Sequence, residues 1–198
     1  MSWEHLFDDL EGQLAAEWEA ERAALDAESE RLRIAKLALR DRLRTLLPAQ
    51  GRLRLSLRGG ERWDAVLRAL GADWIGVTIA GAAPLSIVPL HAVAAIGVDH
   101  GMLLASLADA GAEPGLRERM SFGFVLRDLA RRRMPVRVGG VDDAPLHGTI
   151  DRASADHLDL ALHEPGEARL ARTVRGFRMI PFETVAWVRP ESGSAELL

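Results

Sequence analysis

An internal repeat with a constant offset of 83 residues constrains the fold of this chain more than any other feature of its sequence. The segment Leu43–Asp73 aligns without a gap on Leu126–Asp156, and apolar positions and turn residues recur in the same order. The second copy then carries nine extra residues, after which Val88-Pro89-Leu90 aligns with Ile180-Pro181-Phe182. One supersecondary unit is therefore predicted twice, each time as a helix followed by about five short strands.

Apolar alternation and turn residues predict the strands of both copies. Leu53, Leu55 and Leu57 alternate with polar residues, as in a half-buried strand, and Gly59-Gly60 predicts a hairpin turn. By the same reasoning, strands are expected within residues 52–58, 63–67, 75–79, 85–90 and 93–96, and again within 136–138, 146–152, 157–162, 178–182 and 185–188. Strands this short, joined by tight turns, favour a closed barrel because closure removes exposed edges. The predicted fold class is α+β and mainly β: a long N-terminal helix followed by two tandem helix-plus-five-strand small β-barrels.

Three patterns in the second copy carry a resemblance to a known fold family. They are Leu146-x-Gly148-x-Ile150, Asp156-x-Leu158-x-Leu160 and Ile180-Pro181-x-x-x-Val185-x-x-Val188. Together with the preceding helix, they resemble the Sm-like or SH3-like small β-barrel over roughly residues 40–98 and 122–190. The resemblance implies the barrel fold, and Sm-like proteins commonly form rings and bind RNA. This chain has Ile180-Pro181-Phe182-Glu183 where that family places a polar and basic cluster.

The first 47 residues predict a long helix. From Trp3 to Leu47 there is no proline and only one glycine, Gly12, while alanine, glutamate, leucine and arginine dominate. Pro48 and Gly51 supply a stop signal. Apolar residues recur every seven positions along this segment, at Trp18, Leu25, Leu32, Leu39 and Leu46.

The heptad row allows two interpretations. A coiled coil needs two apolar rows, and the second row here is only half-filled, so the helix either packs one stripe on its own barrels or self-associates. Residues 1–30 hold ten acids and one arginine, a balance of −9, whereas residues 31–58 hold nine basic residues and one acid, a balance of +8. An antiparallel helix pair places these opposite charges together. We therefore expect a homo-oligomer formed through the N-terminal helix, with antiparallel contact.

Five segments follow from these patterns. The long helix, with its coiled-coil potential, is expected over 1–47 and the first barrel over 48–98. An Ala-, Gly- and acid-rich linker is expected over 99–116, the second helix with its barrel over 117–190, and a flexible tail over 191–198.

Composition indicates the compartment in which the protein is expected. The chain contains no cysteine, so it has neither a disulfide framework nor a thiolate nucleophile. No apolar run approaches the roughly 20 residues that cross a bilayer, and the acidic start is unlike a signal peptide. We therefore expect a cytoplasmic protein without a membrane partner. Among its 25 basic residues, 24 are arginine and only Lys36 is lysine, a usage typical of a GC-rich genome, which we expect to be bacterial.

Motifs for catalysis are missing from the sequence. It contains no nucleophile elbow, phosphate loop, dinucleotide fingerprint or zinc-protease motif. His157, Asp159 and His163 share one face of a predicted strand, but the two histidines are six residues apart, about 20 Å along a strand. One metal ion cannot bind both unless the strand bends or ends. We expect no catalytic residue, no cofactor, no metal site and no enzymatic activity.

Arginines of the second copy form the best candidate binding surface. Two groups, one around the second helix and one in the nine-residue insertion, are candidates for anion or nucleic-acid contact: Arg127, Arg131, Arg132, Arg133, Arg137, Arg169, Arg172, Arg175 and Arg178. The leading hypothesis is a non-enzymatic, self-associating cytoplasmic binding or scaffold protein. The alternative is a nucleic-acid-binding regulator, of RNA or DNA, that uses this arginine-rich second copy; an acidic protein partner would satisfy the same charges.

Overall fold

The computed structural model describes residues 3–79, 85–109, 111, 115–140 and 144–191, with side chains from Glu11 onward. The chain divides into two compact units, Met1–Asp41 and Arg42–Leu198. Most of the tail expected over 191–198 lies outside the described residues.

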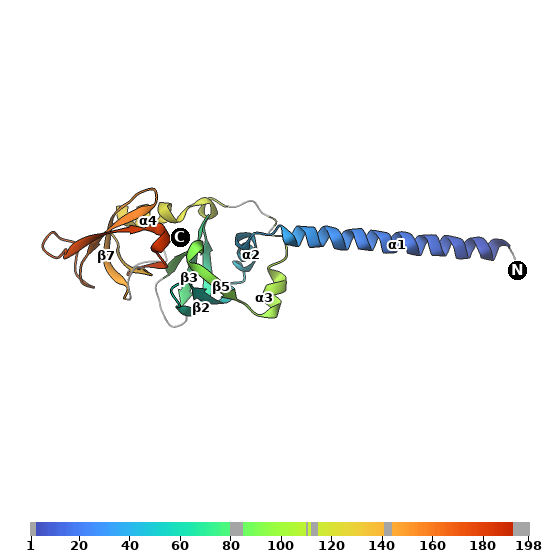
Figure 1. The fold of residues 1–198 in the computed structure, drawn as a ribbon, viewed down its shortest axis with the longest axis horizontal. Helices are drawn as coiled ribbons and strands as arrows, with labels where there is room; N and C mark the ends of the chain where they lie inside the picture. The colour runs from blue at the N-terminus through green and yellow to red at the C-terminus, as the bar shows by residue number, and fades with distance from the viewer. Residues whose placement is uncertain (1–2, 80–84, 110, 112–114, 141–143, 192–198) are drawn as a thin grey trace. The chain divides into compact units, whose positions relative to one another are not determined.

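The first unit consists mainly of α1, the 33-residue helix Trp3–Ala35 (Figure 1). α2 (Leu39–Leu46) follows after three non-helical residues, so two helices occupy the span expected to hold one. The last turn of α1 closes with bonds between residues three apart, from the Lys36 amide to the Arg33 carbonyl (3.2 Å) and from the Leu37 amide to the Ile34 carbonyl (3.1 Å). Such tight bonds commonly end an α-helix.

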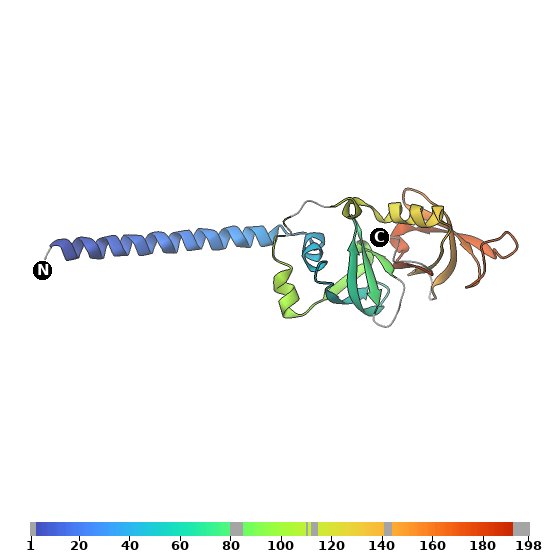
Figure 2. The ribbon, with the colours of Figure 1, turned by 180° about the vertical axis from the view of Figure 1, so that it is seen from behind.

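The second unit repeats one order of elements. Its first half contains the end of α2, then β1 (Arg52–Leu57), β2 (Arg62–Leu70), β3 (Trp74–Ile79), β4 (Ser86–Pro89), the short 3₁₀-helix η1 (Leu90–Ala92) and β5 (Val93–Gly97). The second half contains α4 (Phe122–Arg131), β6 (Pro135–Gly139), β7 (Leu146–Ala153), β8 (His157–Leu162), β9 (Gly176–Pro181), η3 (Phe182–Thr184) and β10 (Trp187–Pro190). Between the halves, the segment expected to be a linker contains the helix α3 (His100–Ala105) and the 3₁₀-helix η2 (Arg117–Arg119). Figure 2 shows α4, in yellow, lying along the strands of the second half.

The repeat extends to details of the hydrogen bonding. A register shift between Leu67 and Ala69 in β2 recurs between Ile150 and Arg152 in β7. The Leu90 amide donates to the Asp73 carbonyl at 2.8 Å, and the matching bond joins Phe182 to Asp156 at 2.7 Å. The two halves thus share a backbone plan as well as an apolar pattern.

The predicted pair of closed barrels is wrong. The ten strands that the structure describes form one open antiparallel sheet in the order β5-β1-β2-β3-β4-β10-β6-β7-β8-β9. β4 of the first half pairs with β10 of the second, with Val188 opposite Ile87. One side of each of these two strands therefore forms its backbone hydrogen bonds with a strand of the other half. The two halves join into one sheet instead of closing into separate barrels. The sheet keeps two edges, β5 and β9.

Two apolar clusters form the core, and each includes a tryptophan from the other half. Trp74 packs in the cluster built on α4 and the second-half strands, while Trp187 packs in the cluster built on α2 and the first-half strands. Glycines make room for both rings: a Cβ at Gly71 would lie 2.0 Å from Trp74, and one at Gly139 would lie 2.1 Å from Trp187. The indole nitrogens are also satisfied, since Trp74 donates to the Met120 carbonyl and Trp187 to the Glu61 carboxylate, each at 2.9 Å.

Polar contacts reinforce the joint between the halves. Arg44 Nε and Glu118 Oε2 lie 2.6 Å apart, and Asp73 Oδ1 accepts a hydrogen bond from the Phe122 amide, at the start of α4, at 2.6 Å. Arg189 donates to the Ser86 hydroxyl at 2.9 Å and lies over the Trp187 ring. Burial lowers the pKa of Arg189, and the nearby charge of Arg137 lowers it further. The joint is thus built from specific side chains and not from strand pairing alone.

Candidate functional site

The nine arginines singled out from the sequence lie on α4, the turn between α4 and β6, β6, β9 and the β8–β9 connection. Several are engaged within the chain. Arg131 and Arg132 pair with Asp128 on the same helix, and Arg127 donates to the Ser154 carbonyl. These contacts lower the net positive charge that α4 offers to a ligand.

The insertion arginines are also matched by acids. Arg169 forms a two-pronged contact with Asp151, and this hydrogen bonding raises the pKa of the guanidinium. Arg175 pairs with Glu164. Acidic side chains therefore pair with four of the nine arginines, Arg131, Arg132, Arg169 and Arg175. Among the described residues, no hydrogen bond or ion pair involves the side chains of Arg133, Arg137, Arg172 and Arg178.

A cavity of about 620 Å³ gathers the most concentrated chemistry of the second unit. Two of the predicted arginines, Arg137 and Arg175, line it together with the histidines His147 and His163 and the acids Glu164 and Glu191. β6 contributes Arg137 and β7 contributes His147, and the register between these strands places the two residues opposite each other. The remaining lining residues are Pro145, Leu146, Leu162 and Pro165.

The two histidines of this cavity hold each other in place. His147 Nδ1 lies 2.7 Å from the His163 carbonyl, and the two rings meet edge to face at 5.0 Å. His163 is buried, with Nε2 2.9 Å from the Thr149 hydroxyl. The second ring nitrogen of His147, Nε2, lies 2.8 Å from Glu191 Oε1, and the two form an ion pair when the imidazole is protonated. The two arginines and two glutamates that line the cavity balance in charge. A nearly neutral cavity suits a polar ligand without net charge better than a polyanion.

A metal ion has no site in the part of the chain that the structure describes, where no three His, Cys, Asp or Glu side chains gather suitably. His157, Asp159 and His163, predicted to share one face of a strand, do not all lie on β8. His163 lies beyond the end of the strand with its own partners, and His157 Nδ1 lies 2.8 Å from Asp156 Oδ1. A hydrogen bond from His157 holds the pKa of Asp156 below its ordinary value of 3.8.

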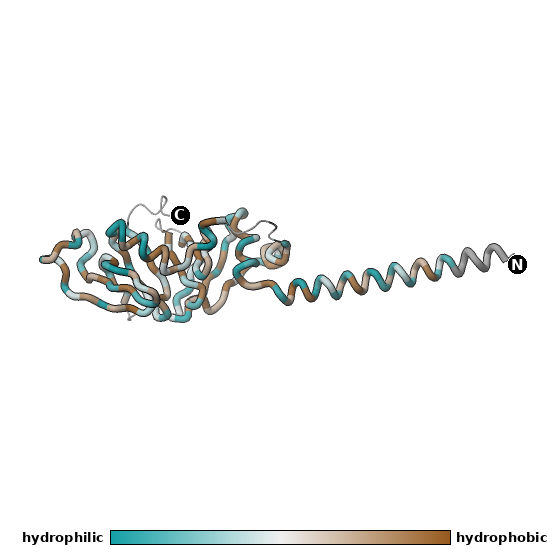
Figure 3. Tube along the Cα trace, turned by 90° about the horizontal axis from the view of Figure 1, so that it is seen from above, coloured by the Kyte–Doolittle hydropathy of each residue, from teal (hydrophilic) through white to brown (hydrophobic). Residues whose placement is uncertain are grey.

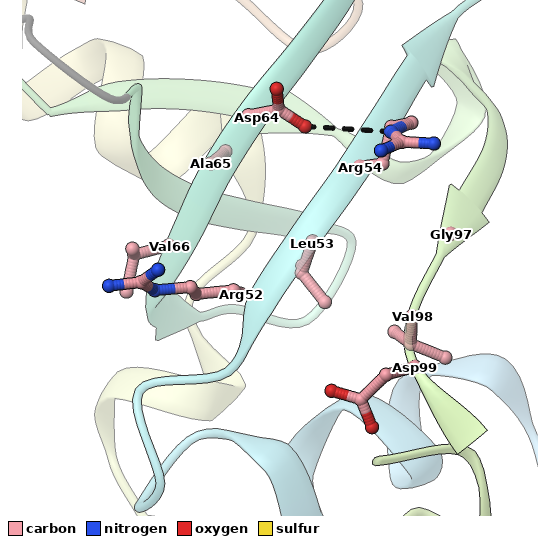
Figure 4. A pocket seen from close by; sticks show the side chains of 9 residues that line it. All are labelled: Arg52, Leu53, Arg54, Asp64, Ala65, Val66, Gly97, Val98 and Asp99. Carbon is pink, nitrogen blue, oxygen red and sulfur yellow. Dashed lines mark ion pairs between the residues drawn. The ribbon is translucent and has the colours of Figure 1, made fainter. Parts of the chain in front are cut away.

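A second hollow of about 780 Å³ lies over β1, β2 and the end of β5 (Figure 4). Arg52, Arg54 and Asp64 line it, with Gly97, Val98 and Asp99 beside the free edge of the sheet. Figure 4 shows Asp64 and Arg54 facing each other from neighbouring strands, with Nε and Oδ1 3.5 Å apart. The residues that line this hollow include no cluster of catalytic side chains, but its charged side chains lie next to the β5 edge of the sheet.

In the first unit, an apolar row runs along α1. Trp18, Leu25 and Leu32 are all exposed, Trp18 at 70% of its surface. Figure 3 shows apolar stretches recurring between hydrophilic ones along this helix. None of the helices that the structure describes combines the length and apolar content needed to cross a membrane.

Comparison with known proteins finds no family model, no curated protein and no solved structure that matches this chain.

Proposed function

We propose that this protein is a non-enzymatic, self-associating binding or scaffold protein of the cytoplasm, assembled through α1. The observation that carries the proposal is the exposed row of Trp18, Leu25 and Leu32. Large exposed side chains that recur every seven residues on one helix, between acidic and basic neighbours, are typical of a helix that pairs with another helix. A cysteine-free chain is consistent with a reducing compartment.

Charge favours a second copy of α1, in antiparallel orientation, as the occupant of this row. A pair centred on Leu25 places Trp18 of one copy beside Leu32 of the other. The acidic Glu17 and Glu19 of each helix then lie beside the basic end of its partner, where Arg31 and Arg33 already pair with acids on their own helix. A parallel pair would stack the acidic halves on each other, which is unfavourable.

The proposal is tested by the mass of the full-length protein in solution. Each antiparallel pair buries Leu25 twice, and burial of one leucine is worth about 1.5–3 kcal/mol. The substitution Leu25→Glu should therefore raise the dimer dissociation constant by a factor of roughly 10² to 10⁴. Sedimentation velocity over a dilution series measures this change directly.

Ala20→Glu provides the matched control, because it adds the same charge to the same helix off the apolar row. We expect Ala20→Glu to leave the association almost unchanged. A full-length protein that is monomeric at tens of micromolar, or equal effects of the two substitutions, would contradict the proposal.

Nucleic acid is the alternative partner, and the arginine contacts favour it less. Five of the nine candidate arginines are engaged within their own chain, namely Arg127, Arg131, Arg132, Arg169 and Arg175. Binding through the rest predicts an affinity for single-stranded RNA or duplex DNA that falls steeply with salt. Titration of labelled 20-mers at low salt separates the two functions, because self-association alone predicts no binding.

A further inference from the structure

The open sheet leaves one edge in each half, and these edges are related to the joint inside the chain. β9 is the repeat equivalent of β4, because Arg178–Pro181 follows Ser86–Pro89 by 92 residues. β5 is the equivalent of β10 by the same offset, which places Ile96 where the second half has Val188. The two free edges are therefore second versions of the two strands that already pair, β4 and β10.

Burial differs sharply between the two versions. Ile87 on β4 is only 1% exposed because it packs beside Val188 in the apolar cluster of the second half. Its equivalent on β9, Met179, is 80% exposed. Phe177 is exposed on the same strand. Long apolar side chains on a free sheet edge are what proteins normally avoid unless another chain covers them.

We propose that β9 of one copy pairs in antiparallel fashion with β5 of a second copy, reproducing the β4–β10 joint between molecules. The register of that joint, transferred by 92 residues, places Met179 opposite Ile96. Ile96 already packs against the first-half apolar cluster, so Met179 would enter the edge of that cluster as Ile87 enters the other. The occupant of each edge is thus the opposite edge of the same protein.

The flanking residues of the two edges are compatible with this register. Phe177 falls opposite Val98, and Arg178 falls opposite Gly97, diagonal to the acidic Asp99. In the joint inside the chain, the arginine is on the other strand, since Arg189 reaches across to Ser86. Each strand pair therefore has one arginine at this position and a small residue opposite it: Arg189 opposite Ser86 inside the chain, and Arg178 opposite Gly97 between copies.

The contact between copies should be weaker than the joint inside the chain. The position of Trp74 is taken by His157, and the position of Trp187 is taken by Ala95, so neither tryptophan anchor is repeated. Each copy has one edge of each kind, which makes the contact heterologous: copies add head to tail and either close a ring or extend. We therefore expect association that depends on concentration.

The absence of cysteine makes the test direct. Two full-length variants, Ile96→Cys and Met179→Cys, are mixed and oxidised gently, and disulfide-linked dimers are measured on non-reducing gels. Residues directly opposite on antiparallel strands lie within disulfide reach, whereas diagonal neighbours about 7–8 Å apart do not. We expect the mixture to cross-link at least tenfold more than either variant alone, and the double variant to form a ladder of multimers.

Ala94→Cys in place of Ile96→Cys provides the control, because it lies two residues along the same exposed edge. Circular dichroism confirms that each variant is folded. No excess of mixed dimer, equal cross-linking with Ala94→Cys, or efficient cross-linking of Met179→Cys with itself would overturn the proposal.

A second arm separates this contact from the assembly through α1. The edges and α1 belong to different units, so the disulfide should form equally well in chains that also carry Leu25→Glu. Loss of the disulfide in that background would overturn the edge as a contact in its own right. A Leu25→Glu substitution without effect on mass, beside a normal disulfide, would instead count against the role of α1 alone.

Discussion

Removal of the Trp187 side chain tests whether the two halves of the sheet form one cooperative unit. Trp187 belongs to the second half by sequence, but it is 3% exposed within the cluster of the first half. It meets Trp63 edge to face at 5.8 Å, donates to Glu61 and supports the guanidinium of Arg189 at 4.9 Å. The substitution Trp187→Ala therefore removes contacts from both halves at once.

The expected loss can be estimated from these contacts. Truncation of a buried aromatic side chain to alanine costs about 3–5 kcal/mol, a value that already includes most of the cavity. Glu61 loses a donor as well, since Trp63 then remains its only indole partner among the described residues. We expect a loss of about 4–5 kcal/mol in the free energy of unfolding. Trp187→Phe keeps much of the volume and should recover about half of that loss.

Urea unfolding followed by far-ultraviolet circular dichroism measures the effect. With a slope of about 2 kcal/mol per molar urea, the midpoint should fall by about 2 M in one transition. Phe124→Ala, which removes a half-exposed aromatic side chain from α4, should shift the free energy of unfolding by less than about 1 kcal/mol. A shift below 1 kcal/mol for Trp187→Ala, or a transition that splits with only one phase affected, would refute the reasoning.

Two further predictions concern the equivalent residues Asp73 and Asp156. Asp73→Ala removes the acceptor at the start of α4 and should cost about 1 kcal/mol in urea unfolding, whereas Asp156→Ala should cost much less; equal losses would contradict the capping role. The hydrogen bond from His157 lowers the pKa of Asp156 in the folded state, so its contribution to stability is present above the unfolded pKa and is lost as pH falls through the lowered folded pKa. Carboxyl NMR titration should show this pKa rise towards 3.8 in His157→Ala, and an unchanged value would rule out the contact.

The sequence predicts local structure here better than it predicts strand partners. Apolar alternation at Leu53, Leu55 and Leu57 indicates which side of β1 is buried, and the structure has all three inside. β4 pairs with β3 of its own half on one side and with β10 on the other, and nothing in the apolar alternation specifies this second partner. The predicted closed barrels were wrong at this step, which depends on tertiary pairing.

The candidate site shows a similar limit. Arginine clusters are visible in the sequence, but the acids that pair with the insertion arginines are distant in it: Asp151 is 18 residues from Arg169, and Glu164 is 11 residues from Arg175. The histidine pair of the cavity was missed for the same reason, since the β7–β8 pairing brings His147 to His163 across 16 residues. A predicted hairpin register could have supplied the signal. The break after α1 had no signal, since Lys36-Leu37-Ala38 contains no helix breaker.

The exchange of tryptophans also bears on how such a chain could change over time. A duplicated unit normally remains separable, because each copy carries a complete interior. Here Trp74 and Trp187 each complete the interior of the other half. Deletion of either half would therefore leave a cavity in the remaining half and expose the tryptophan that it contributes to the deleted one. The two halves therefore depend on each other for a complete interior, and we expect insertions and deletions to be tolerated best in the loops and at the outer edges of the sheet.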